Sequence, residues 1–200
     1  MACNLTKGRA VDCKDSIGGL RTMYILPNYC GNIEASATIA DLEMDDADFA
    51  DWDTYGDPTG SKQTLLQYEL RPNVSSLTVN FNSDAATGTT FWTSVLSVTL
   101  QKLDHDTTNQ LKLAAYNRSQ IFVRDAMDNI FLLGMNAGCN VTSGTMVTGA
   151  AKGDLSGYTL EFTSEEKLPP IQVKPTAGPT TAGYPWDGLT DNGSIAFVTS

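Results

Sequence analysis

The chain of 200 residues has a formal net charge of −10, with 41% hydrophobic and 18% charged residues. This composition excludes a coiled coil and a disordered chain, and its many Gly, Thr, Ser and Asn residues favour strands and turns. No apolar run approaches the roughly 18 residues that a membrane span needs, and the first residues lack the apolar core of a secretory signal. We therefore expect a protein that is made in a cytoplasm and does not bind a membrane.

Four strands are predicted in the first half of the chain: Leu20–Pro27, Asn32–Met44, Lys62–Pro72 and Ser75–Asn82. In the last of them Leu77, Val79 and Phe81 alternate with polar residues, as in a strand with one buried face. Between the second and third strands, residues 56–60 (GDPTG) predict a loop.

The second half begins with a long strand at Phe91–Leu103, followed by a helix at His105–Asn117 with Asp104 as its N-cap. Ile121–Gly134 predicts a hairpin, and Gly153–Pro170 predicts a turn and a strand that Pro169 and Pro170 end. Gly144–Gly149 is predicted to be a loop. The expected fold is mainly β, a β-sandwich or small barrel with one flanking helix.

The C-terminal residues differ from the rest of the chain. Gly and Pro are frequent between Gln172 and Thr190, which predicts an extended arm, and Gly193–Ser200 predicts a short terminal strand. We expect a β domain at 1–172 and an arm at 173–200. The arm either frays or reaches a neighbouring subunit through its apolar residues: Tyr184, Trp186, Ile195 and Phe197.

Much of the negative charge lies in one inserted loop at 41–60, which contains no Lys or Arg. The acidic residues are Asp41, Glu43, Asp45, Asp46, Asp48, Asp51, Asp53 and Asp57. The rest of the chain is nearly balanced, with 15 acidic and 13 basic residues. Such a surface repels nucleic acid, because binding to phosphate requires Lys and Arg.

No metal site is predicted. An EF-hand that began at Asp51 would need a bidentate Glu at its twelfth position, where the chain has Lys62. The cysteines, Cys3, Cys13, Cys30 and Cys139, lack the short spacing of zinc ligands, and we expect them to be reduced thiols. A Cys3–Cys13 disulfide is the alternative in an oxidising environment.

No catalytic or cofactor site is predicted either. Gly144–Gly149 has the spacing of a phosphate-binding loop, but Ala150 and Ala151 follow it in place of Lys and Ser or Thr. His105 is the only histidine, it lies beside the predicted helix cap, and no nucleophile motif accompanies it. Trp92, on an apolar strand, is expected in the core. We expect that the protein is not an enzyme and has no cofactor.

Four pieces of the chain resemble the tail tube proteins of tailed bacteriophages. They are SVTLQKL, the helix end LKLAAYNRS, the hairpin IFVRDAMDNIFLLG, and GDLSGYTLEFTSEEKLPP, which together span about Phe91 to Pro170. The resemblance implies subunits that form hexameric rings whose inner strands join into one β-barrel. It also implies that the rings stack into a tube, with viral DNA passing through the lumen without specific binding.

This resemblance implies a structural protein of the virion tail, assembled in the host cytoplasm, with itself and other tail proteins as partners. The predicted lumen strands are the hairpin of Lys62–Pro72 and Ser75–Asn82, or the strands that flank the acidic loop. The loop itself either bridges stacked rings, lines the lumen or faces solvent.

Two other functions remain open. The chain could form another ring of the tail, a tail terminator or distal-tail ring, which would not stack without limit. It could instead be a carbohydrate-binding β-sandwich that uses Trp52, Trp186 and acidic calcium ligands. A hydrolase centred on His105 is the most remote interpretation.

Overall fold

The structure is a computed structural model that describes residues 8–9, 14–27, 43–44, 63–174, 184, 186 and 195–199. These residues form strands β1 (Leu20–Leu26), β2 (Glu43–Met44), β3 (Gln63–Glu69), β4 (Ser76–Asp84), β5 (Thr89–Gln101), β6 (Gln120–Asp125), β7 (Ile130–Leu133), β8 (Asn140–Val147), β9 (Gly157–Glu166), β10 (Ile171–Val173) and β11 (Ile195–Thr199), and helix α2 (His105–Tyr116). The prediction of a mainly β fold with one helix is therefore confirmed for the described part of the chain.

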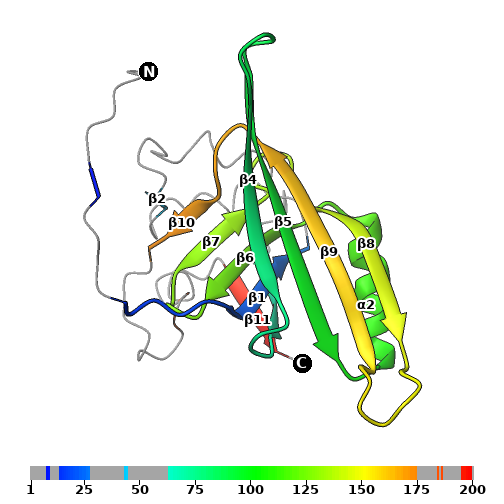
Figure 1. Cartoon of the computed structure of the whole chain (residues 1–200). Coiled ribbons are helices and arrows are strands. Elements are labelled where there is room, and N and C mark those ends of the chain that lie inside the picture. Colours follow the sequence, from blue (N-terminus) through cyan, green and yellow to red (C-terminus); the bar gives the residue numbers. More distant parts are fainter. Residues whose placement is uncertain are drawn as a thin grey trace.

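The strands form two open sheets (Figure 1). The seven-stranded sheet has the order β11-β3-β1-β6-β7-β10-β2, and the four-stranded sheet has the order β4-β5-β9-β8. Neighbouring strands are antiparallel except for β10 with β2 and β11 with β3. Among the described residues, no helix is both long and apolar enough to cross a membrane.

The main hydrophobic core lies between the two sheets. Met23 and Ile25 of β1 pack in the same cluster as Leu96, Val98 and other residues of the four-stranded sheet. A second cluster lies on the opposite face of the seven-stranded sheet, where Tyr24 packs with Trp186 and its neighbours. The middle of the seven-stranded sheet is therefore covered on both faces, which explains why Met23–Leu26 of β1 and Ile121–Val123 of β6 are apolar without alternation.

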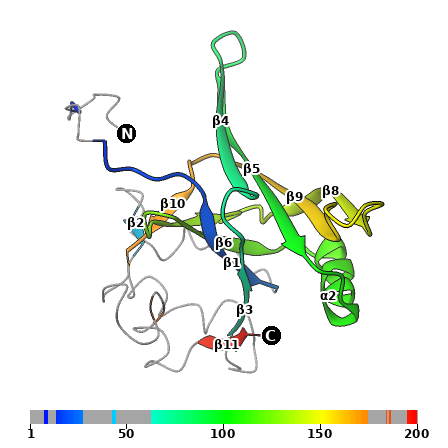
Figure 2. The same cartoon turned by 60° about the horizontal axis from the view of Figure 1, so that its bottom comes forward.

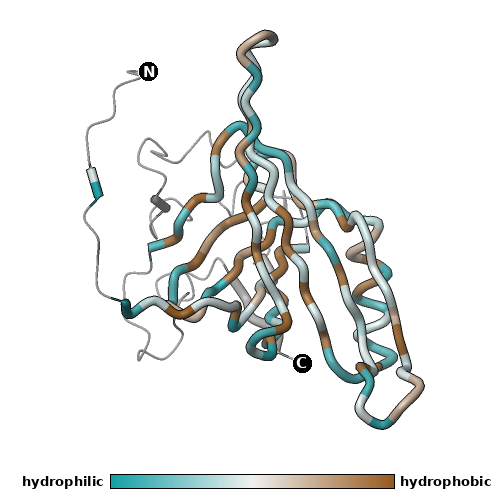
Figure 3. The backbone as a smooth tube through the Cα atoms, viewed as in Figure 1, coloured by the Kyte–Doolittle hydropathy of each residue, from teal (hydrophilic) through white to brown (hydrophobic). Residues whose placement is uncertain are grey.

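The four-stranded sheet has the opposite pattern. Along β5 buried and half-buried side chains alternate, and β9 repeats this pattern. Figure 3 shows the same alternation of hydrophobic and more polar residues along both strands. Only one face of this sheet contributes to the core, as expected for an antiparallel sheet with an open face.

Helix α2 begins where the sequence predicts. The carboxylate of Asp104 accepts hydrogen bonds from the backbone N–H groups of Asp106 and Thr107 at 3.2 Å each. Leu111 is the buried residue that attaches the helix to the main core. His105 is exposed in the first turn, as expected, with a ring nitrogen 3.2 Å from the side-chain amide of Asn109.

The predicted hairpin is also present, as β6 and β7. Its turn is held by Asp125, which accepts hydrogen bonds from the backbone N–H groups of Met127 and Asn129 at 2.8 Å each. Asp128 has a φ of 66°, a left-handed conformation that Asp tolerates better than most residues. Its carboxylate pairs with Arg124 at 2.7 Å and with Arg21 at 3.1 Å, which ties the turn to β6 and β1.

Two sequence predictions were wrong. Lys62–Pro72 and Ser75–Asn82 do not form a hairpin, because β3 pairs with β1 and β11 whereas β4 pairs with β5 in the other sheet. The positive φ of Asn73, at 65°, lies in the connection where the chain passes from one sheet to the other. Residues 144–147 of the predicted loop belong to strand β8, where Gly144 lies level with Leu160 of β9.

Candidate functional site

The most distinctive surface is the face of the four-stranded sheet that points away from the main core. We call it the uncovered face. In Figure 1, β4, β5, β9 and β8 lie in front of the other described elements, whereas α2 and the seven-stranded sheet lie behind them. Leu96 and Phe162 are paired residues that point to the core, so the next pair along the strands, Val95 and Thr163, points to the uncovered face.

Short polar side chains dominate this face. From the strand register its members are Ser76, Thr78, Asn80, Asn82, Asp84, Thr89, Phe91, Thr93, Val95, Ser97, Thr99, Gln101, Asn140, Ser143, Thr145, Val147, Gly157, Thr159, Glu161, Thr163 and Glu165. Some of them bond across strands: the Asn82 amide donates to the Thr93 hydroxyl at 3.0 Å, and the Thr142 and Thr163 hydroxyls lie 3.1 Å apart. Thr142 lies at the register irregularity between Val141 and Ser143.

The charge on the uncovered face is negative only. Strands β4, β5, β8 and β9 contain no Lys, Arg or His. The face carries Glu161 and Glu165, and Asp84 lies at the end of β4. Hydrogen bonds from the backbone N–H of Ala86 and from Thr87 lower the pKa of Asp84, which stays ionised at neutral pH. The face therefore combines hydroxyl groups with carboxylates and lacks a group that binds phosphate tightly.

Glu166, the fourth acidic residue of these strands, has a different environment. As the residue next to Glu165 in β9, it points to the opposite face of the sheet. There its carboxylate accepts hydrogen bonds from the backbone N–H groups of Asn136 and Ala137 at 2.9 and 2.8 Å. It holds the loop that follows β7. We regard Glu166 as a structural residue.

The two edges of the four-stranded sheet are open. Among the described strands, β4 pairs only with β5, and β8 pairs only with β9. Because all three pairings in the sheet are antiparallel, β4 and β8 run in opposite directions. An open edge exposes a row of unpaired N–H and C=O groups that can pair with another chain.

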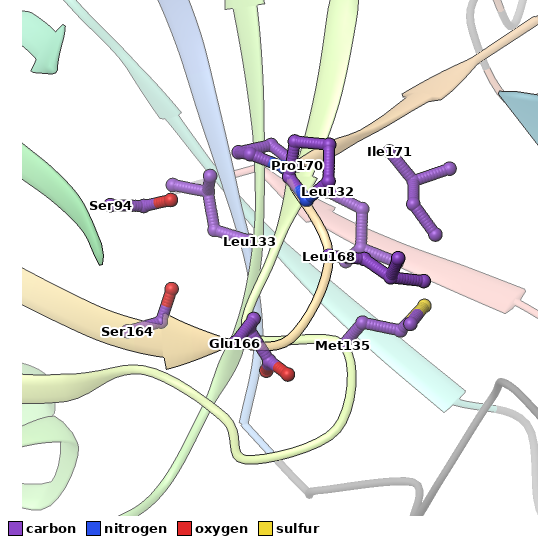
Figure 4. A pocket seen from close by; sticks show the side chains of 11 residues that line it. Ser94, Leu132, Leu133, Met135, Ser164, Glu166, Leu168, Pro170 and Ile171 are labelled. Atoms are coloured by element: carbon purple, nitrogen blue, oxygen red, sulfur yellow. The ribbon is translucent and has the colours of Figure 1, made fainter. Parts of the chain in front are cut away.

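The pocket between the sheets does not fit an organic substrate (Figure 4). Its volume is about 10 Å³, and its lining includes Ser94, Ser164 and Glu166. A single water molecule needs about this much space. The described residues also contain no group of three His, Cys, Asp or Glu side chains placed to hold a metal ion.

Comparison of the chain with protein-family models, with curated proteins and with solved structures found no match.

The acidic loop contributes little to the described structure. Glu43 belongs to β2, which pairs with β10 at the edge of the seven-stranded sheet. The other acidic residues of the loop, Asp41, Asp45, Asp46, Asp48, Asp51, Asp53 and Asp57, lie outside the described residues. Their predicted role stays a prediction. Cys3, Cys13 and Cys30 also lie outside, whereas Cys139 is a buried free thiol.

The aromatic residues differ from the expectations. Trp186, predicted in an arm that either frays or reaches a neighbour, is 1% exposed in the core of its own chain. Tyr184 packs beside the same core and donates a hydrogen bond from its hydroxyl to the backbone carbonyl of Asp128 at 3.2 Å. Because it is buried, Trp186 is not accessible to stack against a sugar in a carbohydrate-binding site. Trp92, expected in the core, is only half-buried.

The described end of the predicted arm also belongs to this fold. Ile195 and Phe197 belong to β11, which pairs in parallel with Gln63 and Leu65 of β3. The division into residues 1–172 and 173–200 stays a prediction. Two parts of the second segment nevertheless pack on the first.

The uncovered face was not predicted from the sequence. A signal was available, because the four strands that form it are all free of basic residues. However, the sequence does not show that β8 and β9 lie next to β5, and without this topology the hydroxyl residues do not form one surface.

Proposed function

We propose that the chain is a tail tube subunit of a tailed bacteriophage, whose copies form rings that stack into a tube. In this proposal the uncovered face of the four-stranded sheet lines the lumen. The main observation behind this proposal is the uncovered face, which is polar and carries only negative charge. Its two edge strands, β4 and β8, are unpaired on their outer sides among the described strands and run in opposite directions. The sequence resemblance of Phe91–Pro170 provides independent support.

The two edge strands of the four-stranded sheet, β4 and β8, can join neighbouring subunits into a ring. When β8 of one subunit lies beside β4 of the next, the two strands are antiparallel, so the pattern of the sheet continues across the contact. Repetition of this head-to-tail contact closes a ring, and a closed barrel has no exposed edges. The number of subunits in the ring follows from the resemblance, which implies six.

The negative charge of the uncovered face is suited to the passage of DNA through the lumen. A duplex moves along a wall of carboxylates and hydroxyl groups without forming ion pairs, because Glu161 and Glu165 repel phosphate. The short side chains leave the wall even, which favours sliding. We thus assign the lumen to β4, β5, β9 and β8. The two sequence alternatives were the hairpin of Lys62–Pro72 and Ser75–Asn82, or the strands that flank the acidic loop.

Negative-stain electron microscopy of the purified protein at increasing concentration tests this proposal. We expect rings with a central hole and, at higher concentration, hollow tubes. Rings that never stack would indicate a tail terminator or distal-tail ring instead. Single particles at every concentration would refute the proposal.

A further inference from the structure

Strand β4 carries two exposed apolar side chains on the face that should be buried. Val79 is 36% exposed and Phe81 is 56% exposed. Both lie on the core-facing side of the sheet, since Val79 is paired with the buried Ser94 and Phe81 is paired with Trp92. The rings of Phe81 and Trp92 lie 4.8 Å apart, so Phe81 is supported from one side only.

Nothing among the described elements covers these residues, because the hairpin of β4 and β5 extends beyond the other sheet. Figures 1 and 2 both show the end of this hairpin projecting past the other described elements. We call Val79 and Phe81 the hairpin patch.

An apolar groove lies at the opposite edge of the same sheet, between α2 and β8. Its volume is about 270 Å³, and it is lined by Thr108, Leu111, Lys112, Gly144, Thr145, Met146, Tyr158 and Leu160. A cavity of about 150 Å³ is enough for a benzene ring, so this α2–β8 groove has room for a phenyl ring. Met146 is 61% exposed at its edge.

Gly144 leaves the groove open. A Cβ atom at this position would lie 3.1 Å from the Cδ2 atom of Leu160 and would occupy space that is now free. The groove opens on the same side of the sheet as the hairpin patch, because Leu111 and Leu160 belong to the main core cluster.

We propose that the α2–β8 groove of one subunit receives the hairpin patch of a second copy of this chain. The proposal rests on the proposed function and names the side chains that hold neighbouring subunits together. The contact is head-to-tail: each copy donates its patch to one neighbour and receives the patch of another.

The strand register of the four-stranded sheet supports the hairpin patch of a second copy as the group that fills the groove. Asn140, the first residue of β8, pairs with Thr163 of β9, which pairs with Val95 of β5, and Val95 pairs with Thr78 of β4. Asn140 and Thr78 therefore lie at the same height in the sheet, and residues 79–84 of β4 extend beyond the start of β8. If the register between subunits is shifted by about four residues, β8 of one subunit lies opposite most of β4 of the next. A shift of about four residues per four strands is the stagger of a barrel whose shear number equals its strand number, with strands tilted by about 36°. At this shift Val79 of the neighbour lies opposite Gly144.

The same shift places Phe81 of the neighbour opposite Val141, one inward-facing position from Gly144. Val79 then lies at the groove, and Phe81 lies next to it, beside Val141, which is not among the residues that line the groove.

The test uses two variants that each break one half of the contact. Phe81→Ser removes the patch and keeps the groove, whereas Met146→Asp places a charge at the groove and keeps the patch. Both positions are exposed, so we expect folded proteins with unchanged circular dichroism. Each variant alone should need at least about 30-fold more protein for assembly than the wild-type chain, as for an interface hot spot.

A mixture of the two variants gives the decisive result. The intact patch of Met146→Asp fits the intact groove of Phe81→Ser, so the mixture should form dimers by analytical ultracentrifugation, whereas each variant alone stays monomeric. The dimer cannot grow, because its remaining patch and groove are both defective.

Matched controls exclude a general effect of lost apolar surface. Phe91→Ser removes an aromatic ring from the same hairpin on the uncovered face, and Leu113→Ser removes an exposed apolar residue of α2 outside the groove. Both should assemble like the wild-type chain.

Three results would overturn the inference. Normal assembly of Phe81→Ser would refute the contact and leave the proposed function intact. Wild-type protein that stays monomeric would refute both. Loss of monomer stability in both variants, with no dimer in the mixture, would indicate that a segment of the same chain occupies the groove.

Discussion

The indole ring of Trp186 meets the ring of Tyr24 edge-on, with 5.3 Å between their centroids and an angle of 86° between their planes. Phe122 meets the same indole at 4.8 Å and 75°. These contacts bring a residue of the C-terminal segment into the core formed by β1 and β6. Trp186 is therefore part of the fold of its own chain.

Replacement of Trp186 by Ala should be strongly destabilising. The indole is 1% exposed, and loss of such a side chain from a core costs about 3–5 kcal/mol of unfolding free energy. Urea denaturation measures the change. Trp92→Ala is the control, because Trp92 is only half-buried and should cost less.

Truncation before Pro175 provides a related test. Removal of residues 175–200 deletes both Trp186 and β11, so we expect a destabilised subunit, whereas an arm that served only a neighbour would leave the monomer intact. A truncated chain with an unchanged urea midpoint would contradict the packing described for Trp186.

Substitution of Gly157 should disturb the contact between β5 and β9. A Cβ atom at this position would lie only 2.1 Å from the carbonyl oxygen of Leu100, and both groups belong to the backbone. We expect Gly157→Ala to lower stability by about 3 kcal/mol, at the upper end of the usual cost of overpacking. Gly153→Ala is the matched control, since nothing lies within 4 Å of its added Cβ atom, and its thermal midpoint should change little.

The thiol of Cys139 should make stability depend on alkaline pH. Burial raises its pKa to about 12, from 9.0 for an exposed thiol. Above pH 9 the unfolded chain loses this proton and the folded chain keeps it, so the unfolding free energy falls as pH rises toward 12, by up to about 1.4 kcal/mol per pH unit. Below pH 9 this contribution is fully present.

Comparison with Cys139→Ala isolates this effect. Burial also raises the pKa values of Tyr24 and Tyr68, so both proteins should lose stability above pH 10. Urea denaturation at pH 8 and pH 10.5 should show a smaller decrease for Cys139→Ala. Equal decreases in the two proteins would contradict the assigned pKa of Cys139.

Reversal of charge on the uncovered face should change how tubes treat DNA. If this face lines the lumen, Glu161→Lys with Glu165→Lys should convert a repelling wall into one that binds phosphate. We expect variant tubes assembled with short duplex DNA to retain it in cosedimentation, and to release it as salt rises.

The control for this experiment places the same charges elsewhere. Asp15 and Glu69 are exposed residues outside the four-stranded sheet, so Asp15→Lys with Glu69→Lys should retain less DNA. Equal retention by the two double variants would mean that the uncovered face is not the lumen.

Local features of the fold were predictable from sequence because they depend on neighbouring residues. Asp104 caps α2 through its own next residues, and the turn between β6 and β7 is held by Asp125 within the turn. The alternation along β5 also indicates a strand with one buried face, because side chains alternate across a strand. For these elements a short segment contains most of the information.

The partners of strands and distant side chains were decided by the tertiary structure. Gly144 in a glycine-rich stretch reads as a loop, but pairing of β8 with β9 makes it part of an edge strand. The Pro and Gly around Trp186 predict an extended arm, but its indole is buried against Tyr24 and Phe122 of the seven-stranded sheet. Apolar burial depends on which surfaces meet, and this information is not local.

The sequence by itself determined that the chain is mainly β and where several of its strands lie, and the segments that form β4, β5, β8 and β9 contain no basic residues. Only the tertiary structure decided that these four strands lie side by side and present one acidic, hydroxyl-rich face between two open edges. The physical reason is that a strand's propensity is set by its own side chains, whereas its neighbours in a sheet are set by backbone hydrogen bonds between distant segments.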